Sequence, residues 1–214
     1  MAKGSDLAGT KAAAAAGRRR TQEERRREAE TRLLDAAIGL IAERGILNTS
    51  LGDVGEAAGY SRGLPSHHFK AKAGLTEAVR AEILRRMAER MSPPAGVNGL
   101  EALCAVIRAV LAGVHEPLTS AFLEFQKAAI PQESADRQAL TAFHREVSAK
   151  LEVHVRAGQA TGEIRADVDP NAQAHLLLIS LRGVLAQQLL SADPPSIEAA
   201  VAALERRTRR ALAA

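Results

Sequence analysis

The sequence TSLGDVGEAAGYSRGLPSHHF, residues 49–69, decides the fold of this chain. Ser50 and Asp53 have the spacing of a capping box, in which each side chain bonds the backbone of the other at the start of a helix. The apolar residues that follow recur at helical spacing, which gives this segment one apolar face: Leu51, Val54 and Ala58. The first half of the stretch therefore predicts a short amphipathic helix.

The second half of the stretch predicts a sharp turn and another helix. Gly59 is suited to the left-handed backbone conformation that a tight turn requires. Tyr60 is expected to point back toward the core, and Ser61 to cap the second helix. A helix, a glycine turn and a second capped helix form the helix-turn-helix plan, in which the second helix enters the major groove of DNA.

The composition indicates an all-helical protein. The chain has 214 residues, of which 46% are hydrophobic and only 2% aromatic, so its core is expected to be aliphatic. The dominance of helix formers over strand formers favours an all-α fold. The single cysteine excludes an internal disulfide and favours a reducing, cytoplasmic setting, and no apolar run approaches the length of a membrane span.

Positive charge is concentrated at the N-terminus. The whole chain carries a formal net charge of +4, whereas residues 1–27 alone hold eight basic and three acidic residues, a net charge of +5. Residues 1–20 are expected to form a basic flexible tail that ends in Arg18, Arg19 and Arg20. Two interpretations of this arginine run stay open, a solvated leader and an arm that contacts DNA phosphates.

About nine helices are expected along the chain. Thr21 opens the first with a second capping box, and Gly45 ends it. A fourth helix is expected after Gly74, and prolines divide the rest of the chain into further helices. Asp169 followed by Pro170 has the pattern of a cap and a first helical residue.

Two segments resemble the tetracycline-repressor (TetR) family of bacterial transcription regulators. The run LLDAAIGLIAERGILNTSLGDVGEAAGYSRGLPSHHFKAKAGL, residues 33–75, is similar to the DNA-binding domain of that family, and GEIRADVDPNAQAHLLLISLRGVL, residues 162–185, is similar to its first dimer helix. The resemblance implies a helix-turn-helix domain over 21–72 and a helical ligand-binding and dimerisation domain over 73–214. It further implies a homodimeric repressor or activator, with a repressor favoured, that reads a palindromic operator under the control of a small molecule.

The resemblance also implies which residues meet DNA. It places Ser61, Arg62 and Gly63 at the end that reads bases, where an arginine can form two hydrogen bonds to guanine. The remaining expected contacts are to phosphate: Thr49, Ser66, His67, His68 and Lys72. The chain departs from the family at Pro65 and Ser66, where leucine and tyrosine are usual, and at Gly55, where alanine is usual. The proline is expected to tilt the helix, and the glycine to lower helix propensity.

The C-terminal part is expected to hold an effector and the dimer interface. Helices 4 and 7 are expected to flank the effector, which is predicted to be lipophilic because the region is aliphatic, and effector binding is expected to move helix 4. The candidate effector-binding residues are Cys104, Ile107, His115, Phe122, Phe125, Phe143 and His144. The candidate dimer residues share one face of a helix: Leu176, Ile179, Gly183, Ala186 and Leu190.

Two other function classes stay open at this point. The arginine run favours a ligand-independent protein that organises DNA, and a small-molecule enzyme or carrier with a vestigial DNA-binding domain is the second alternative. The sequence contains none of the common phosphate-binding, metalloprotease or hydrolase motifs, so nothing positive favours an enzyme. Neither a metal nor a cofactor is expected, since His67 and His68 point in different directions on a helix.

Overall fold

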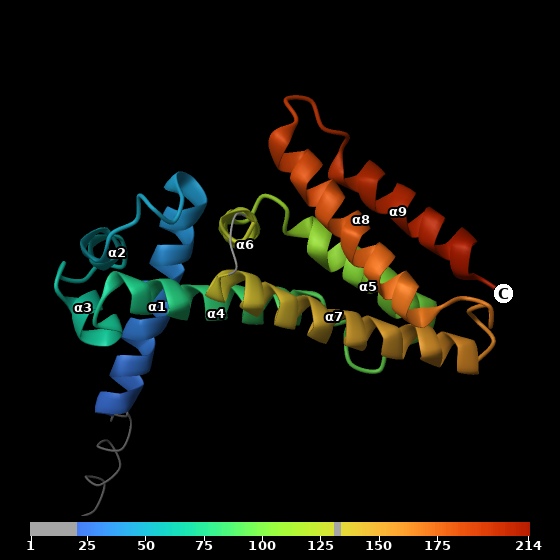
Figure 1. Ribbon diagram of the computed structural model, residues 1–214, viewed down its shortest axis with the longest axis horizontal. Helices are drawn as coiled ribbons and strands as arrows, with labels where there is room; N and C mark the ends of the chain where they lie inside the picture. Colours follow the sequence, from blue (N-terminus) through green and yellow to red (C-terminus); the bar gives the residue numbers. More distant parts are fainter. Residues whose placement is uncertain (1–20, 131–133) are drawn as a thin grey trace, which may run out of the picture.

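The structure is a computed structural model that describes residues 21–130 and 134–214. Within these residues it contains nine α-helices, as the sequence predicted (Figure 1). Their bounds are α1 Gln22–Arg44, α2 Leu51–Ala57, α3 Leu64–Phe69, α4 Lys72–Arg90, α5 Gly99–Ala112, α6 Pro117–Ala128, α7 Ala135–Ala160, α8 Pro170–Leu190 and α9 Ile197–Leu212.

Helices α1 to α3 form one unit around a small apolar core. The capping box predicted at Thr21 is present, and α1 ends at Arg44 with Gly45 as its C-cap, which has a φ of 83°. The second predicted box, between Ser50 and Asp53, is also present and opens α2. The side chain of Phe69, at the end of α3, is buried in the same apolar cluster as the inner face of α1. These local signals therefore fix where the first two helices begin.

Helix α4 connects this unit to the rest of the molecule. It begins at Lys72, earlier than the predicted start after Gly74, and its inner face is buried as predicted: Leu75, Val79, Ile83 and Met87. This helix packs against α1 and α3 on one side and against α6 and α7 on the other. The proposed domain boundary at residues 72 and 73 thus falls in the first turn of a helix that both parts share.

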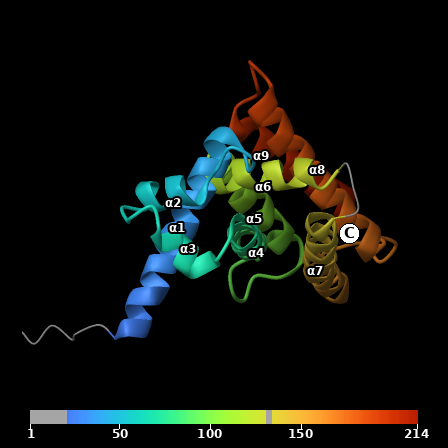
Figure 2. The ribbon, with the colours of Figure 1, turned by 60° about the vertical axis from the view of Figure 1, so that its left-hand side comes forward.

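Helix α5 is the centre of the C-terminal part. Nine of its 14 residues are buried, because α7, α8 and α9 surround it. Figure 2 shows α5 between α4 and the α8–α9 pair. Among the described residues, no single helix is long and apolar enough to cross a membrane; α5 and α6 reach that composition only as a pair bent by 94°.

Candidate nucleic-acid interface and ligand cavity

The turn between α2 and α3 depends on two glycines. Gly59 has a φ of 78°, the left-handed conformation that was predicted for it. Gly55 is buried where α2 crosses the start of the next helix, and a Cβ atom there would lie 2.6 Å from the Ser61 carbonyl oxygen and 3.1 Å from Cδ of Pro65. The expectation that Gly55 only lowers helix propensity was incomplete, because this crossing leaves no room for a side chain.

Helix α3 begins later than predicted. Its N-cap is Gly63 without a side-chain cap, and its first residue is Leu64, so the expectation that Ser61 caps the helix was wrong. The later start places Pro65 in the first helical turn, where a missing backbone N–H leaves no helical hydrogen bond unmade. The proline therefore sets the start of α3, and Ser61 and Arg62 lie in the turn before it.

One face of this turn and helix is open to solvent. The predicted base-reading and phosphate-contacting residues on it are exposed, except that His68 is half-buried beside Phe69: Ser61, Arg62, Gly63, Ser66 and His67. Sequence reasoning missed Lys70, an exposed cation at the C-cap of α3 with a φ of 64°. Its position directly after the helix that carries the two histidines could have indicated it.

Arg62 is held against α2 in the free chain. Its guanidinium pairs with Glu56 at 2.7 Å, and this hydrogen bond raises the pKa of Arg62. A Cβ atom at Gly52 would lie 3.0 Å from the same guanidinium, so the arginine side chain lies across this glycine. Because the pair is exposed, its net contribution is small. A guanine base can therefore replace Glu56 as the partner of Arg62.

Two of the predicted phosphate contacts form hydrogen bonds with the connection between α1 and α2. Thr49 is only 3% exposed, and its hydroxyl donates to the carbonyl of Gly45 at 3.0 Å. Its hydroxyl is therefore not free for phosphate, which corrects the expectation from the sequence. Lys72 is exposed, but its Nζ donates to the carbonyl of Leu47 at 2.8 Å. Arg18, Arg19 and Arg20 lie outside the described residues.

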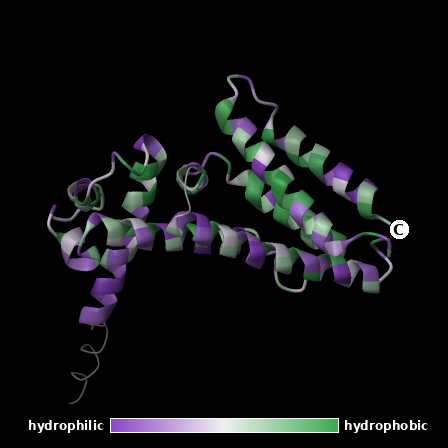
Figure 3. Cartoon of the chain, in the orientation of Figure 1, coloured by the Kyte–Doolittle hydropathy of each residue, from purple (hydrophilic) through white to green (hydrophobic). Residues whose placement is uncertain are grey.

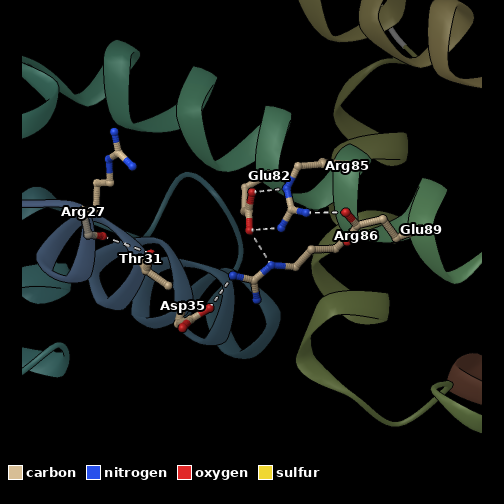
Figure 4. Close-up of polar contacts among 7 residues, drawn as sticks. All are labelled: Arg27, Thr31, Asp35, Glu82, Arg85, Arg86 and Glu89. Atoms are coloured by element: carbon tan, nitrogen blue, oxygen red, sulfur yellow. Dashed lines mark hydrogen bonds and ion pairs between the residues drawn. The ribbon is translucent and has the colours of Figure 1, made fainter. Parts of the chain in front are cut away.

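A charge network joins α4 to α1. The guanidinium of Arg86 pairs with Asp35 on α1 at 2.6 Å and with Glu82 on its own helix at 2.6 Å (Figure 4). Arg85 pairs with Glu82 and with Glu89. Hydrogen bonds from the two arginines lower the pKa of Glu82 to about 2, although burial opposes this shift. A displacement of α4 would therefore strain its contact with the DNA-binding unit.

Two more arginines tie α4 to the C-terminal part. Arg80 pairs with Asp136 of α7 at 2.5 Å, and both side chains are largely buried. Arg90 pairs with Glu116 and donates to Thr119 at the start of α6. Sequence reasoning did not find these pairs, since their partners are 26 to 56 residues apart.

A small cavity lies between the end of α4 and helices α6, α7 and α8. Its volume is about 20 Å³, room for about one water molecule. Its apolar lining consists of Met91, Phe122, Leu123, Phe143, Leu178 and Leu185. Its polar lining consists of Gln126, His144 and Arg182.

The cavity brings together three of the seven predicted effector residues, namely Phe122, Phe143 and His144. The rings of the two phenylalanines meet edge to face, with centroids 5.5 Å apart. The other four do not line it, because Cys104, Ile107 and Phe125 are buried in the core and His115 is exposed in the connection between α5 and α6. Sequence alone could not separate core from lining, and it also missed Arg182.

One face of α8 leaves apolar side chains in solvent. Leu176, Ile179 and Leu190 are 47%, 64% and 76% exposed. Gly183 is exposed and Ala186 half-buried on the same face, so the five predicted dimer residues stay largely free of contacts within the chain. Figure 3 shows the hydrophobic residues that run along α8. The opposite face carries the leucines that pack onto α5 and α7.

Comparisons with known proteins place both parts of the chain in one family. A family model described as bacterial regulatory proteins of the tetR family matches residues 33–79, and one described as the tetracyclin repressor-like C-terminal domain matches residues 96–204. The transcriptional regulator BetI of Cronobacter sakazakii is 27% identical over 79% of this chain and 83% of its own length.

Solved structures show the same fold. A Rhodococcus protein described as a TetR-family transcriptional regulator superposes with a TM-score of 0.73 at 26% identity, over 86% of this chain and 98% of its own. GusR of Salmonella enterica superposes with a TM-score of 0.68 at 28% identity, over 89% of this chain and 95% of its own.

Proposed function

Because this chain belongs to the TetR family of bacterial regulatory proteins, we propose that it is a repressor that reads a palindromic operator as a homodimer and responds to a small effector. Proteins of this family regulate transcription by binding DNA and are not enzymes, which removes the enzyme alternative. We also propose that the protein acts in the cytoplasm, where the operator DNA is located.

The observation that carries this proposal is the exposed face formed by the turn and α3. Ser61, Arg62 and Gly63 are exposed to solvent shortly after the Gly59 turn, at the start of α3. An arginine there reaches the O6 and N7 atoms of guanine, while Ser66 and His67 lie where phosphates would pass. Lys70 adds a positive charge to the same face, and we include it among the phosphate contacts.

The apolar face of α8 supports the homodimer. Three large apolar side chains on one helix are costly to leave in water, and a second copy of the same face would bury them. Gly183 lies within this face and has no atom within 4 Å of its Cβ position, so it leaves space for close approach of a partner helix. Two DNA-binding units would then read successive major grooves, about 34–36 Å apart.

The position of Met91 supports control by an effector. This residue is the C-cap of α4 and lines the cavity. A ligand is much larger than 20 Å³ and must widen the cavity, which displaces the end of α4. Arg86 transmits that displacement to Asp35 on α1, and so changes the spacing of the two reading units.

Sedimentation and footprinting test this proposal together. The expected result is a dimer at micromolar concentration that protects one short palindrome on a DNA fragment. Broad protection along the fragment, without a preferred site, would instead favour the alternative of a DNA-organising protein. A monomer that binds a single half-site would contradict the role given to α8.

A further inference from the structure

One cation, the exposed residue Arg182, lines the cavity between α4, α6, α7 and α8, and it makes no ion pair within the described part of the chain. Arg182 is the only charged side chain in its lining, which otherwise consists of apolar residues, Gln126 and His144. Among the described residues, the one hydrogen-bond partner of its guanidinium is Nε2 of His144, at 2.6 Å. Arg182 is also the only Asp, Glu, Lys or Arg residue in the 21 residues of α8.

The partner of Arg182 is a neutral imidazole. Burial, and then the positive charge of Arg182, lower the pKa of His144 to about 4. Since a guanidinium can only donate, Nε2 of His144 accepts and its proton is on Nδ1. The contact therefore orients the guanidinium toward the cavity without neutralising its charge.

The lining of the cavity contains no acidic residue, and three acids of the helices that form it are paired elsewhere. One acid on each of α4, α6 and α7 binds a basic residue of its own helix: Glu89, Glu124 and Glu146. Two arginines on neighbouring helices do pair with an acid, since Arg108 and Arg209 both bind Glu101. The lining thus combines one positive charge that has no acidic partner among the described residues with apolar and aromatic side chains.

A second polar group points to the same ligand chemistry. The amide of Gln126 lines the cavity and has no hydrogen-bond partner within the described part of the chain. An amide N–H and a guanidinium are both donors, and together they match the oxygens of a carboxylate. A cationic ligand would meet Arg182 with like charge and find no acid in the lining.

We propose that the effector is a carboxylate with an apolar body, whose acid group pairs with Arg182 and Gln126 while its body lies between Phe122, Phe143 and Leu178. This inference rests on the proposed effector control, and it narrows the lipophilic effector expected from the sequence to an organic anion. Insertion of the apolar body displaces Met91, a flexible side chain that can move to make room. In the proposed dimer, Arg182 lies beside the face that carries Ile179 and Gly183. Dimerisation would remove water from its guanidinium, which raises the free-energy cost of leaving this charge without an anion.

The test measures ligand binding to the full chain by calorimetry, with two matched pairs of probes. Octanoate and 4-phenylbutanoate carry the acid, octanamide and 4-phenylbutanamide carry the same bodies without charge, and octyltrimethylammonium supplies a cation. We expect at least one carboxylate to bind about 10-fold or more tightly than its amide, because hydrogen bonds to charged groups are the stronger ones. Equal binding of acid and amide, tighter binding of the cation, or no binding of either acid at 5 mM would overturn the inference.

Variants assign the effect to one side chain. Arg182→Gln is expected to abolish the preference for acid over amide, and Arg182→Lys to keep part of it. Arg145→Gln is the matched control, because Arg145 is an exposed arginine on α7 next to His144 in sequence that does not line the cavity. An unchanged preference in Arg182→Gln, or an equal loss in Arg145→Gln, would refute the role of Arg182. Thermal melting of each variant confirms that it is folded.

A separate DNA measurement distinguishes this inference from the proposed function. Fluorescence anisotropy with a selected operator measures DNA binding without any ligand. Loss of carboxylate binding with operator binding intact would overturn only the effector class. Carboxylate binding without sequence-specific DNA binding would overturn the proposed regulator and leave the ligand site.

Discussion

Replacement of Gly55 by alanine tests how α2 and α3 are placed. A Cβ atom there would lie 2.6 Å from the carbonyl oxygen of Ser61, 3.2 Å from Cα of Arg62 and 3.1 Å from Cδ of Pro65. Two of these are backbone atoms, so the contact cannot be relieved by a side-chain rotation. Overpacking of this kind costs about 1–3 kcal/mol. The gain in helix propensity from alanine is about 1 kcal/mol or less.

The net expectation for Gly55→Ala is a loss of about 1–2 kcal/mol of unfolding free energy, since the contact outweighs the propensity gain. For a chain of this length, that corresponds to a melting temperature about 2–8 °C lower. Circular dichroism during heating measures it, and anisotropy measures the accompanying loss of operator affinity as α3 shifts.

Gly39→Ala is the matched control for this experiment. Gly39 lies inside α1, and no atom within 4 Å would meet its Cβ. Alanine there should stabilise the protein by about 0.5–1 kcal/mol. The reasoning is wrong if Gly55→Ala is as stable as the wild type, or if both substitutions raise the melting temperature alike.

Three further predictions concern DNA binding and assembly. Arg62→Ala should relax base preference at one position of each half-site by about 5- to 150-fold. Glu56→Gln should increase operator affinity, because it frees Arg62 from its ion pair. If the selected DNA sequences are unchanged in both variants, Arg62 does not read a base. Deletion of residues 1–20 should make the slope of log affinity against log salt shallower by about 0.9 for each arginine that contacts phosphate, and an identical slope would exclude the arm. Ile179→Glu should convert the dimer to a monomer in sedimentation, while Val153→Glu, at a position 61% exposed on α7, should not; dimers in both variants would contradict the α8 interface.

Local sequence signals predicted much of the helical framework. The capping boxes at Thr21 and Ser50 and the positive φ of Gly59 are confirmed, because each depends on residues within a few positions of one another. The buried face of α4 is confirmed for the same reason, since a stripe at helical spacing must face a core.

Features that depend on packing between distant segments were not predictable. The start of α3 was misjudged because Ser61 is a good cap locally, whereas the crossing at Gly55 and the place of Pro65 move the start to Leu64. The hydroxyl of Thr49 was expected at DNA, yet the fold turns it toward Gly45.

The residues that line the cavity were equally hard to predict from the sequence. An apolar stripe does not reveal which of its residues face a cavity, so Phe122 lines it while Phe125, three residues later, is core. Arg182 could not be found by helical periodicity, because its significance comes from a cavity lining, contributed by four helices, that contains no acid. Only the arrangement of those helices makes it a candidate site residue.

Selection of bound sequences from random duplex DNA, followed by competition against unselected duplexes at physiological salt, tests the central claim most directly. We predict enrichment of one palindrome whose half-site centres are about one helical turn apart, bound roughly 10³-fold or more tightly than random DNA. Equal affinity for selected and random duplexes would contradict the claim that the turn at Gly59 and the face of α3 read base sequence.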